Sequence, residues 1–122
     1  MGRIFPGIDL FDPQFFNITP KEATHINPQE RLFLETAWHA MQDAGYTQKA
    51  IKGKSVGVFV GAMWSDYHFT DLHAQPPSTL HASIANRVSY VLDLKGPSLG
   101  LDSMCSSSLT AIHLACESIL AG

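Results

Sequence analysis

One cysteine stands in a segment whose residue order is typical of an exposed nucleophile. An apolar run ends at Asp102, and after Ser103 and Met104 the chain reaches Cys105 and three serines. This order predicts a strand, a sharp turn and the start of a helix. The first N–H groups of a helix lack partners within the helix and carry partial positive charge, so they favour a thiolate over a thiol. The serine hydroxyls can cap the helix, and their small size leaves room beside the sulfur. Cys105 is therefore the candidate nucleophile.

The cysteines and serines also have other possible roles. A free cysteine more commonly packs as a small hydrophobic side chain. That interpretation suits Cys116, which falls in the middle of an apolar helical segment, and we expect it in the core. The serine nucleophile of hydrolases needs glycines two residues before and after it, and neither Ser103 nor Ser107 has them.

A cysteine nucleophile usually works with a histidine. His113 follows Cys105 by eight residues on one predicted helix, a rise of about 12 Å, which is beyond the reach of an imidazole. Spacing does not exclude His81, or His68 and His73 in the preceding loop, but each is more typical of a polar surface. We predict that the base lies outside this chain.

The cysteine pattern argues against a metal site. The two cysteines are eleven residues apart, and neither a Cys-x-x-Cys pair nor a His-Glu-x-x-His helix occurs. No Gly-rich phosphate loop opens a helix either. We therefore predict no bound metal and no resident cofactor.

The amino-acid composition limits the kinds of partner that the chain is expected to bind. The chain has 122 residues, 45% of them hydrophobic and 16% charged, with 8 basic and 11 acidic side chains and a net charge of -3. This balance is typical of a globular domain and predicts no nucleic-acid partner. No apolar run approaches the roughly 20 residues of a membrane span, and no signal peptide is evident, so we expect a cytoplasmic protein with no membrane partner.

Hydrophobic periodicity predicts an α/β layer architecture. Helices are expected after Asp12-Pro13 and Thr19-Pro20, and over residues 28–44, 79–92 and 106–120; strands are expected over 55–61 and 98–102. The last helix is apolar on most of its circumference and is expected to be largely buried. Two further expectations are an exposed ion-pair row of Arg31, Glu35 and His39, and a loop over 62–77 that either lines a site or is a surface connection. Two strands are few for a sheet, so the chain looks incomplete.

The segment around Cys105 resembles the active-site signature of β-ketoacyl synthases, in particular the ketosynthase domains of bacterial modular polyketide synthases. The signature residues are Asp102-Ser103-Met104-Cys105-Ser106-Ser107-Ser108-Leu109. Further similar segments occur in the family's order: Phe11-Asp12-Pro13, Phe15-Phe16, Asn27-Pro28-Gln29-Glu30-Arg31, Ala85-Asn86-Arg87 and Gly96-Pro97-Ser98. Met104 and the segment 110–113 look most like the corresponding residues of polyketide synthases that use separate, trans-acting acyltransferases.

This resemblance implies part of a thiolase-like α/β fold that dimerises beside the strand leading to Cys105. It implies that Cys105 accepts an acyl group from the phosphopantetheine of an acyl carrier protein. A decarboxylated malonyl unit on another carrier then attacks the thioester. The cysteine's own N–H is one donor to the developing oxyanion.

Relatives of this family carry two catalytic histidines and a lysine beyond the cysteine. We therefore expect residues 1–122 to be a fragment of a single ketosynthase domain, lacking the first strand and the C-terminal half and inactive alone. The alternatives are a non-catalytic ketosynthase-like piece for dimerisation or carrier docking, and a CoA-dependent thiolase-like enzyme.

Overall fold

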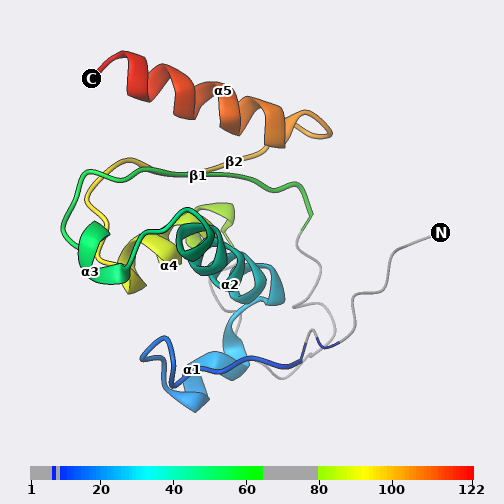
Figure 1. Ribbon diagram of the computed structural model, residues 1–122. Coiled ribbons are helices and arrows are strands. Elements are labelled where there is room, and N and C mark those ends of the chain that lie inside the picture. The colour runs from blue at the N-terminus through cyan, green and yellow to red at the C-terminus, as the bar shows by residue number, and fades with distance from the viewer. Residues whose placement is uncertain (1–6, 8, 65–79) are drawn as a thin grey trace.

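The computed structural model describes residues 7, 9–64 and 80–122, and it is an α/β structure as predicted (Figure 1). In chain order the elements are α1 (Pro20–His25), α2 (Pro28–Asp43), α3 (Gln48–Ile51), β1 (Val58–Gly61), α4 (His81–Val91), β2 (Ser98–Leu101) and α5 (Ser107–Leu120). The opening stretch and most of the 62–77 loop, with His68 and His73, lie outside the described residues.

The two strands form a parallel pair at the centre of these elements. Val58 is opposite Ser98, and the register runs to Gly61 opposite Leu101. Helix α5 covers one face of the pair, while α4 packs on the other with α2 beside it (Figure 1). Parallel strands with helices on both faces are buried on both sides, which accounts for the continuous apolar sequence of β1. The carboxyl ends of both strands therefore meet at one edge.

Side-chain caps fix the starts of the first helices. The Thr19 hydroxyl accepts a hydrogen bond from the Glu22 N–H at 3.2 Å, and the Asn27 amide oxygen accepts one from the Gln29 N–H at 2.9 Å. Both helices have proline in the first turn, where its missing N–H costs nothing. The expected helix after Asp12-Pro13 is wrong. The Asp12 carboxylate does accept from the Phe15 N–H, but the segment is a turn that ends at Asn17 with φ 56°.

The core lies between the sheet and the helices α2 and α4. Leu34, Val88 and Leu92 are its largest fully buried side chains, and Trp38 and Met41 pack against it, which places the apolar residues at spacings of four and three along α2 on one face. The expected ion-pair row on α2 is wrong, because Arg31 is only 9% exposed and its buried Nε has no partner among the described residues. The spacing of apolar residues shows one buried face of a helix, but it does not show that a second, polar face is also covered by other segments.

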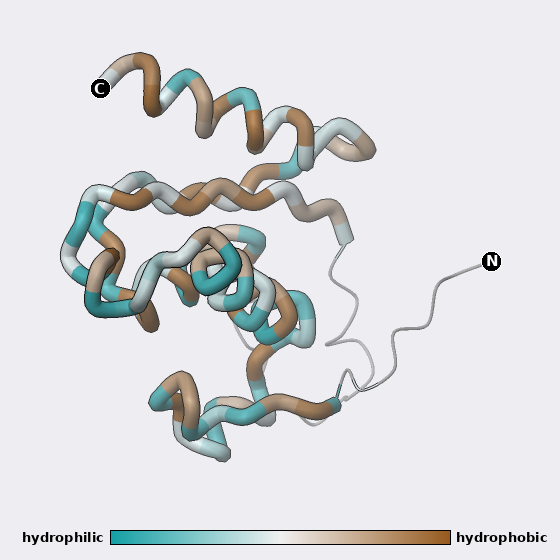
Figure 2. The backbone as a smooth tube through the Cα atoms, viewed as in Figure 1, coloured by the Kyte–Doolittle hydropathy of each residue, from teal (hydrophilic) through white to brown (hydrophobic). Residues whose placement is uncertain are grey.

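Helix α5 departs furthest from expectation. Its near face packs on β1 through the buried Ser107 and Ala111, but its opposite side is open. The exposed apolar residues of α5 are Leu109, Ile112, Leu114, Ile119 and Leu120, and apolar segments recur along the helix in Figure 2. The expectation of a largely buried helix is therefore wrong for the described structure, and Cys116 is exposed rather than in the core. Within the described part of the chain, no helix has the length and apolarity to cross a membrane.

Candidate active site

The carboxyl end of β2 leads directly into the turn that carries Cys105. Three residues, 102–104, separate the last strand residue, Leu101, from the cysteine, and α5 begins two residues after it. Because β1 and β2 are parallel, their last residues, Gly61 and Leu101, lie at the same edge of the sheet. The predicted order of strand, sharp turn and helix is confirmed, and Cys105 is a free, exposed cysteine at this junction.

Met104 makes the turn sharp. Its φ is 59°, in the left-handed region that only glycine adopts without steric cost. The Asp102 carboxylate supports this conformation by accepting the Met104 N–H at 2.8 Å. The Met104 side chain is 60% exposed, so packing does not hold the residue in place. The hydrogen bond and the start of α5 hold the backbone that presents Cys105.

The serine hydroxyls around the turn do not cap α5 as predicted. The N-cap residue Ser106 makes no capping hydrogen bond from its side chain; its hydroxyl instead donates to the Ser103 carbonyl at 2.7 Å. The Ser107 hydroxyl donates to the Met104 carbonyl at 2.7 Å and accepts from the Ser103 N–H at 2.9 Å. Thr110 adds a hydroxyl contact to Ser103 at 3.0 Å. These side chains tie the helix start back to the turn.

Gly61 allows the helix start to lie close to β1. A Cβ atom on Gly61 would lie 2.5 Å from the Ser107 carbonyl carbon and 2.7 Å from the Ser108 nitrogen, much closer than the ordinary contact distance of about 3.5 Å. Glycine is therefore needed here for close approach of two backbones. Sequence reasoning placed Asp102 and Ser107 in the signature but missed the hydrogen bonds that they make to the turn. It also missed Gly61, for which the glycine at a strand end was the available signal.

Two of the candidate histidines, His81 and His113, lie among the described residues. His113 is exposed on α5, eight residues beyond the cysteine, and His81 begins α4. In the described ranges, no group of three or more histidine, cysteine or acidic side chains is placed to hold a metal ion.

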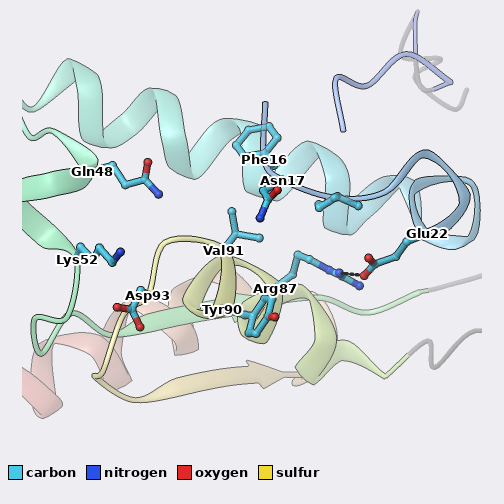
Figure 3. A pocket seen from close by; sticks show the side chains of 10 residues that line it. Phe16, Asn17, Glu22, Gln48, Lys52, Arg87, Tyr90, Val91 and Asp93 are labelled. Carbon is cyan, nitrogen blue, oxygen red and sulfur yellow. Dashed lines mark hydrogen bonds and ion pairs between the residues drawn. The ribbon is translucent and has the colours of Figure 1, made fainter. Parts of the chain in front are cut away.

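A cavity of about 590 Å³ lies among α1, α3 and α4 (Figure 3). Two of the charged side chains that line it are paired: Arg87 forms an ion pair with Glu22 at 2.6 Å, and it also pairs with Glu30 at 3.4 Å. Burial raises the pKa of the Glu30 carboxyl, and the charge of Arg87 partly opposes that rise. A hydrogen bond from Lys95 lowers the pKa of Asp93 at the rim. This cavity is lined by helices on the opposite side of the sheet from α5, so it is separate from the cysteine site.

Comparison with known proteins identifies the family. The family model for the β-ketoacyl synthase N-terminal domain matches residues 1–122. Polyketide synthase PksM of Bacillus subtilis is 52% identical over 134 residues, and polyketide synthase ThaG of Burkholderia thailandensis is 50% identical over 127 residues. Each alignment covers 99% of this chain, but only 3% and 2% of those proteins respectively.

Two solved ketosynthases show the same fold. The ketosynthase from module 6 of the bacillaene synthase of Bacillus subtilis 168 superposes with a TM-score of 0.88 at 39% identity, over 97% of this chain and 20% of that one. The oxazolomycin ketosynthase domain OzmH KS7 of Streptomyces albus JA3453 gives a TM-score of 0.83 at 46% identity, over 96% and 21%. The α/β arrangement is thus part of a thiolase-like fold, as predicted.

The chain belongs to the β-ketoacyl synthase family, to its N-terminal domain. The resemblance to ketosynthase domains of polyketide synthases is confirmed by these relatives. The chain spans about a fifth of the length of the solved ketosynthases that it matches.

Proposed function

We propose that this chain is the nucleophile-bearing part of a ketosynthase domain in a polyketide synthase, and that Cys105 is its acyl acceptor. The observation that carries the proposal is the position of Cys105. It is an exposed, free thiol two residues before α5, directly after a left-handed residue that turns the chain sharply at the end of β2. A nucleophile at such an elbow can meet a substrate without obstruction from its own backbone.

The first reaction is acyl transfer. The thiolate sulfur of Cys105 forms a bond to the carbonyl carbon of an acyl thioester, and the carbonyl oxygen takes the negative charge. When the carbonyl re-forms, the bond from carbon to the donor sulfur breaks and the donor leaves as a thiolate. Backbone N–H groups near the helix start are suited to stabilise the oxyanion because their positions are fixed before the reaction.

Family membership supports the identity of the donor. In a ketosynthase the acyl group arrives on the phosphopantetheine thiol of an acyl carrier protein, and a malonyl unit on a carrier then condenses with it after losing carbon dioxide. The proposal extends to an acyltransferase of the 3-oxoacyl-[acyl-carrier-protein] synthase type that acts as a homodimer in the cytoplasm.

The open side of α5 supports the proposal that this chain is one part of a larger domain. Ile112 and Ile119 are 60% and 80% exposed on that side, and exposed apolar patches of this kind mark surfaces that pack against other protein. The solved ketosynthases have about five times the length matched here, which is consistent with further chain covering this helix.

The proposal is tested by acylation of the full-length protein with an acyl thioester of a holo acyl carrier protein, followed by mass spectrometry. We expect one acyl adduct in the unsubstituted protein and in Cys116→Ala, and none in Cys105→Ala. Cys116→Ala is the matched control because both cysteines are exposed on or beside α5. Undiminished acylation of Cys105→Ala would reject the proposal and favour a non-catalytic role. Acylation by acyl-CoA but not by the carrier would favour a thiolase-like enzyme.

A further inference from the structure

Ser107 makes an unusual set of contacts for the first residue of a helix. The residue is buried, with only 5% of its surface exposed. The hydroxyl donates to the Met104 carbonyl at 2.7 Å, while the Ser107 N–H donates to the same carbonyl at 3.1 Å. The hydroxyl also accepts the Ser103 N–H at 2.9 Å. Both acceptor positions of the Met104 carbonyl are thus used by one residue.

These contacts determine the direction of the next N–H group. No peptide bond among the described residues is cis, and in a planar trans peptide the C=O and the N–H point in opposite directions. The Met104 carbonyl is directed toward Ser107 at the start of α5. The N–H of Cys105, in the same peptide plane, is therefore directed away from the helix.

We propose that Ser107 is a positioning residue that aims the N–H of Cys105 at the oxygen of the substrate thioester carbonyl. This inference rests on the proposed function. Met104 adopts a left-handed conformation, which is sterically unfavourable for a residue with a side chain. The peptide between residues 104 and 105 therefore needs other contacts to keep its orientation. The hydroxyl bridge opposes rotation of that peptide. Without it, a single backbone hydrogen bond would hold the carbonyl, and the N–H would sample a wider range of directions.

A different role would be stabilisation of the start of α5 alone. The two roles predict different effects on two reactions of the same sulfur. Acyl transfer develops negative charge on a carbonyl oxygen and needs an aimed N–H donor. Alkylation by iodoacetamide displaces iodide from a saturated carbon, so it develops no oxyanion. A purely structural role for Ser107 would change both rates together.

The experiment compares the two rates at Cys105 in the full-length protein, with acetyl-phosphopantetheine thioester and iodoacetamide as probes. For Ser107→Ala we expect acetylation to slow about 10-fold or more, since loss of a whole oxyanion donor costs about 100-fold to 1,000-fold. Alkylation should stay within about 2-fold, because it needs no such donor. Ser107→Thr keeps the hydroxyl and should restore most of the acetylation rate. Ser118→Ala removes a hydroxyl eleven residues further along α5 and should change neither rate.

Three results would overturn the inference. Acetylation of Ser107→Ala at the unsubstituted rate would show that the hydroxyl does not aim the N–H. Equal slowing of acetylation and alkylation would assign Ser107 to helix stability. Both results leave the proposed function standing. Failure of the unsubstituted protein to be acetylated at Cys105, with alkylation intact, would instead reject the proposed function and this inference with it.

Discussion

Substitution of Gly61 by alanine tests whether the cysteine turn depends on close approach of α5 to β1. The new Cβ would lie 2.5 Å from the Ser107 carbonyl carbon and 2.7 Å from the Ser108 nitrogen. Restoring a contact distance of about 3.5 Å requires the first turn of the helix to move by about 1 Å. Both neighbours are backbone atoms, so no side-chain rotation relieves the clash. We therefore expect a loss near the upper end of the overpacking range, about 3 kcal/mol of unfolding free energy.

Gly57→Ala is the matched control, because it makes the same substitution just before the same strand. There the nearest atom to the new Cβ is the Phe59 ring carbon Cε2 at 2.8 Å, the far end of a side chain that can rotate. The expected loss is below about 1 kcal/mol. Urea unfolding measures both variants, and the rate of Cys105 acylation should fall much more in Gly61→Ala. Equal stability and equal acylation of the two variants would refute the close-approach argument.

Two further substitutions test the surroundings of the site and the buried ion pair. Met104→Gly should keep or raise the unfolding free energy by up to about 1 kcal/mol, because glycine adopts the observed φ of 59° without strain, whereas Met104→Ala should give no gain; urea unfolding of the pair decides this. Arg87→Met leaves the Glu30 carboxylate buried without its cation and should cost about 2 kcal/mol near pH 7. Burial already raises the pKa of Glu30, so the folded state holds that proton more tightly than the unfolded state, and the cost should shrink as the pH falls through the raised pKa. A loss that stays the same as the pH is lowered from 7 toward the acid limit of folding would contradict this explanation.

Local signals in the sequence were sufficient for the helix starts and for the cysteine turn. Thr19 and Asn27 cap their helices through neighbours two or three residues away, and such contacts depend on short segments alone. The same local logic failed after Asp12. A capping carboxylate and a following proline suit a single turn as well as a helix, and the left-handed Asn17 ended the segment.

Two kinds of contact were not predictable from periodicity: contacts between distant segments, and contacts that depend on the backbone path through a turn. Arg31 was expected at the surface, yet packing buries it on α2. The serines after Cys105 were expected to cap the helix, but Ser107 binds back to residues 103 and 104. The direction of a hydroxyl depends on the backbone path through the left-handed Met104, which residue types do not specify. For α5, apolar composition indicated a buried helix but not which surface covers it.

The measurement that tests the central claim most directly is the site of acylation in the unsubstituted full-length protein. Cys105 and Cys116 are both free and exposed in the described structure, so accessibility alone would label both. After reaction with an acyl thioester of a holo acyl carrier protein, peptide mapping by mass spectrometry should find the acyl group on Cys105 and not on Cys116. Equal occupancy of the two cysteines, or acylation of Cys116 alone, would contradict the assignment of Cys105 as the nucleophile.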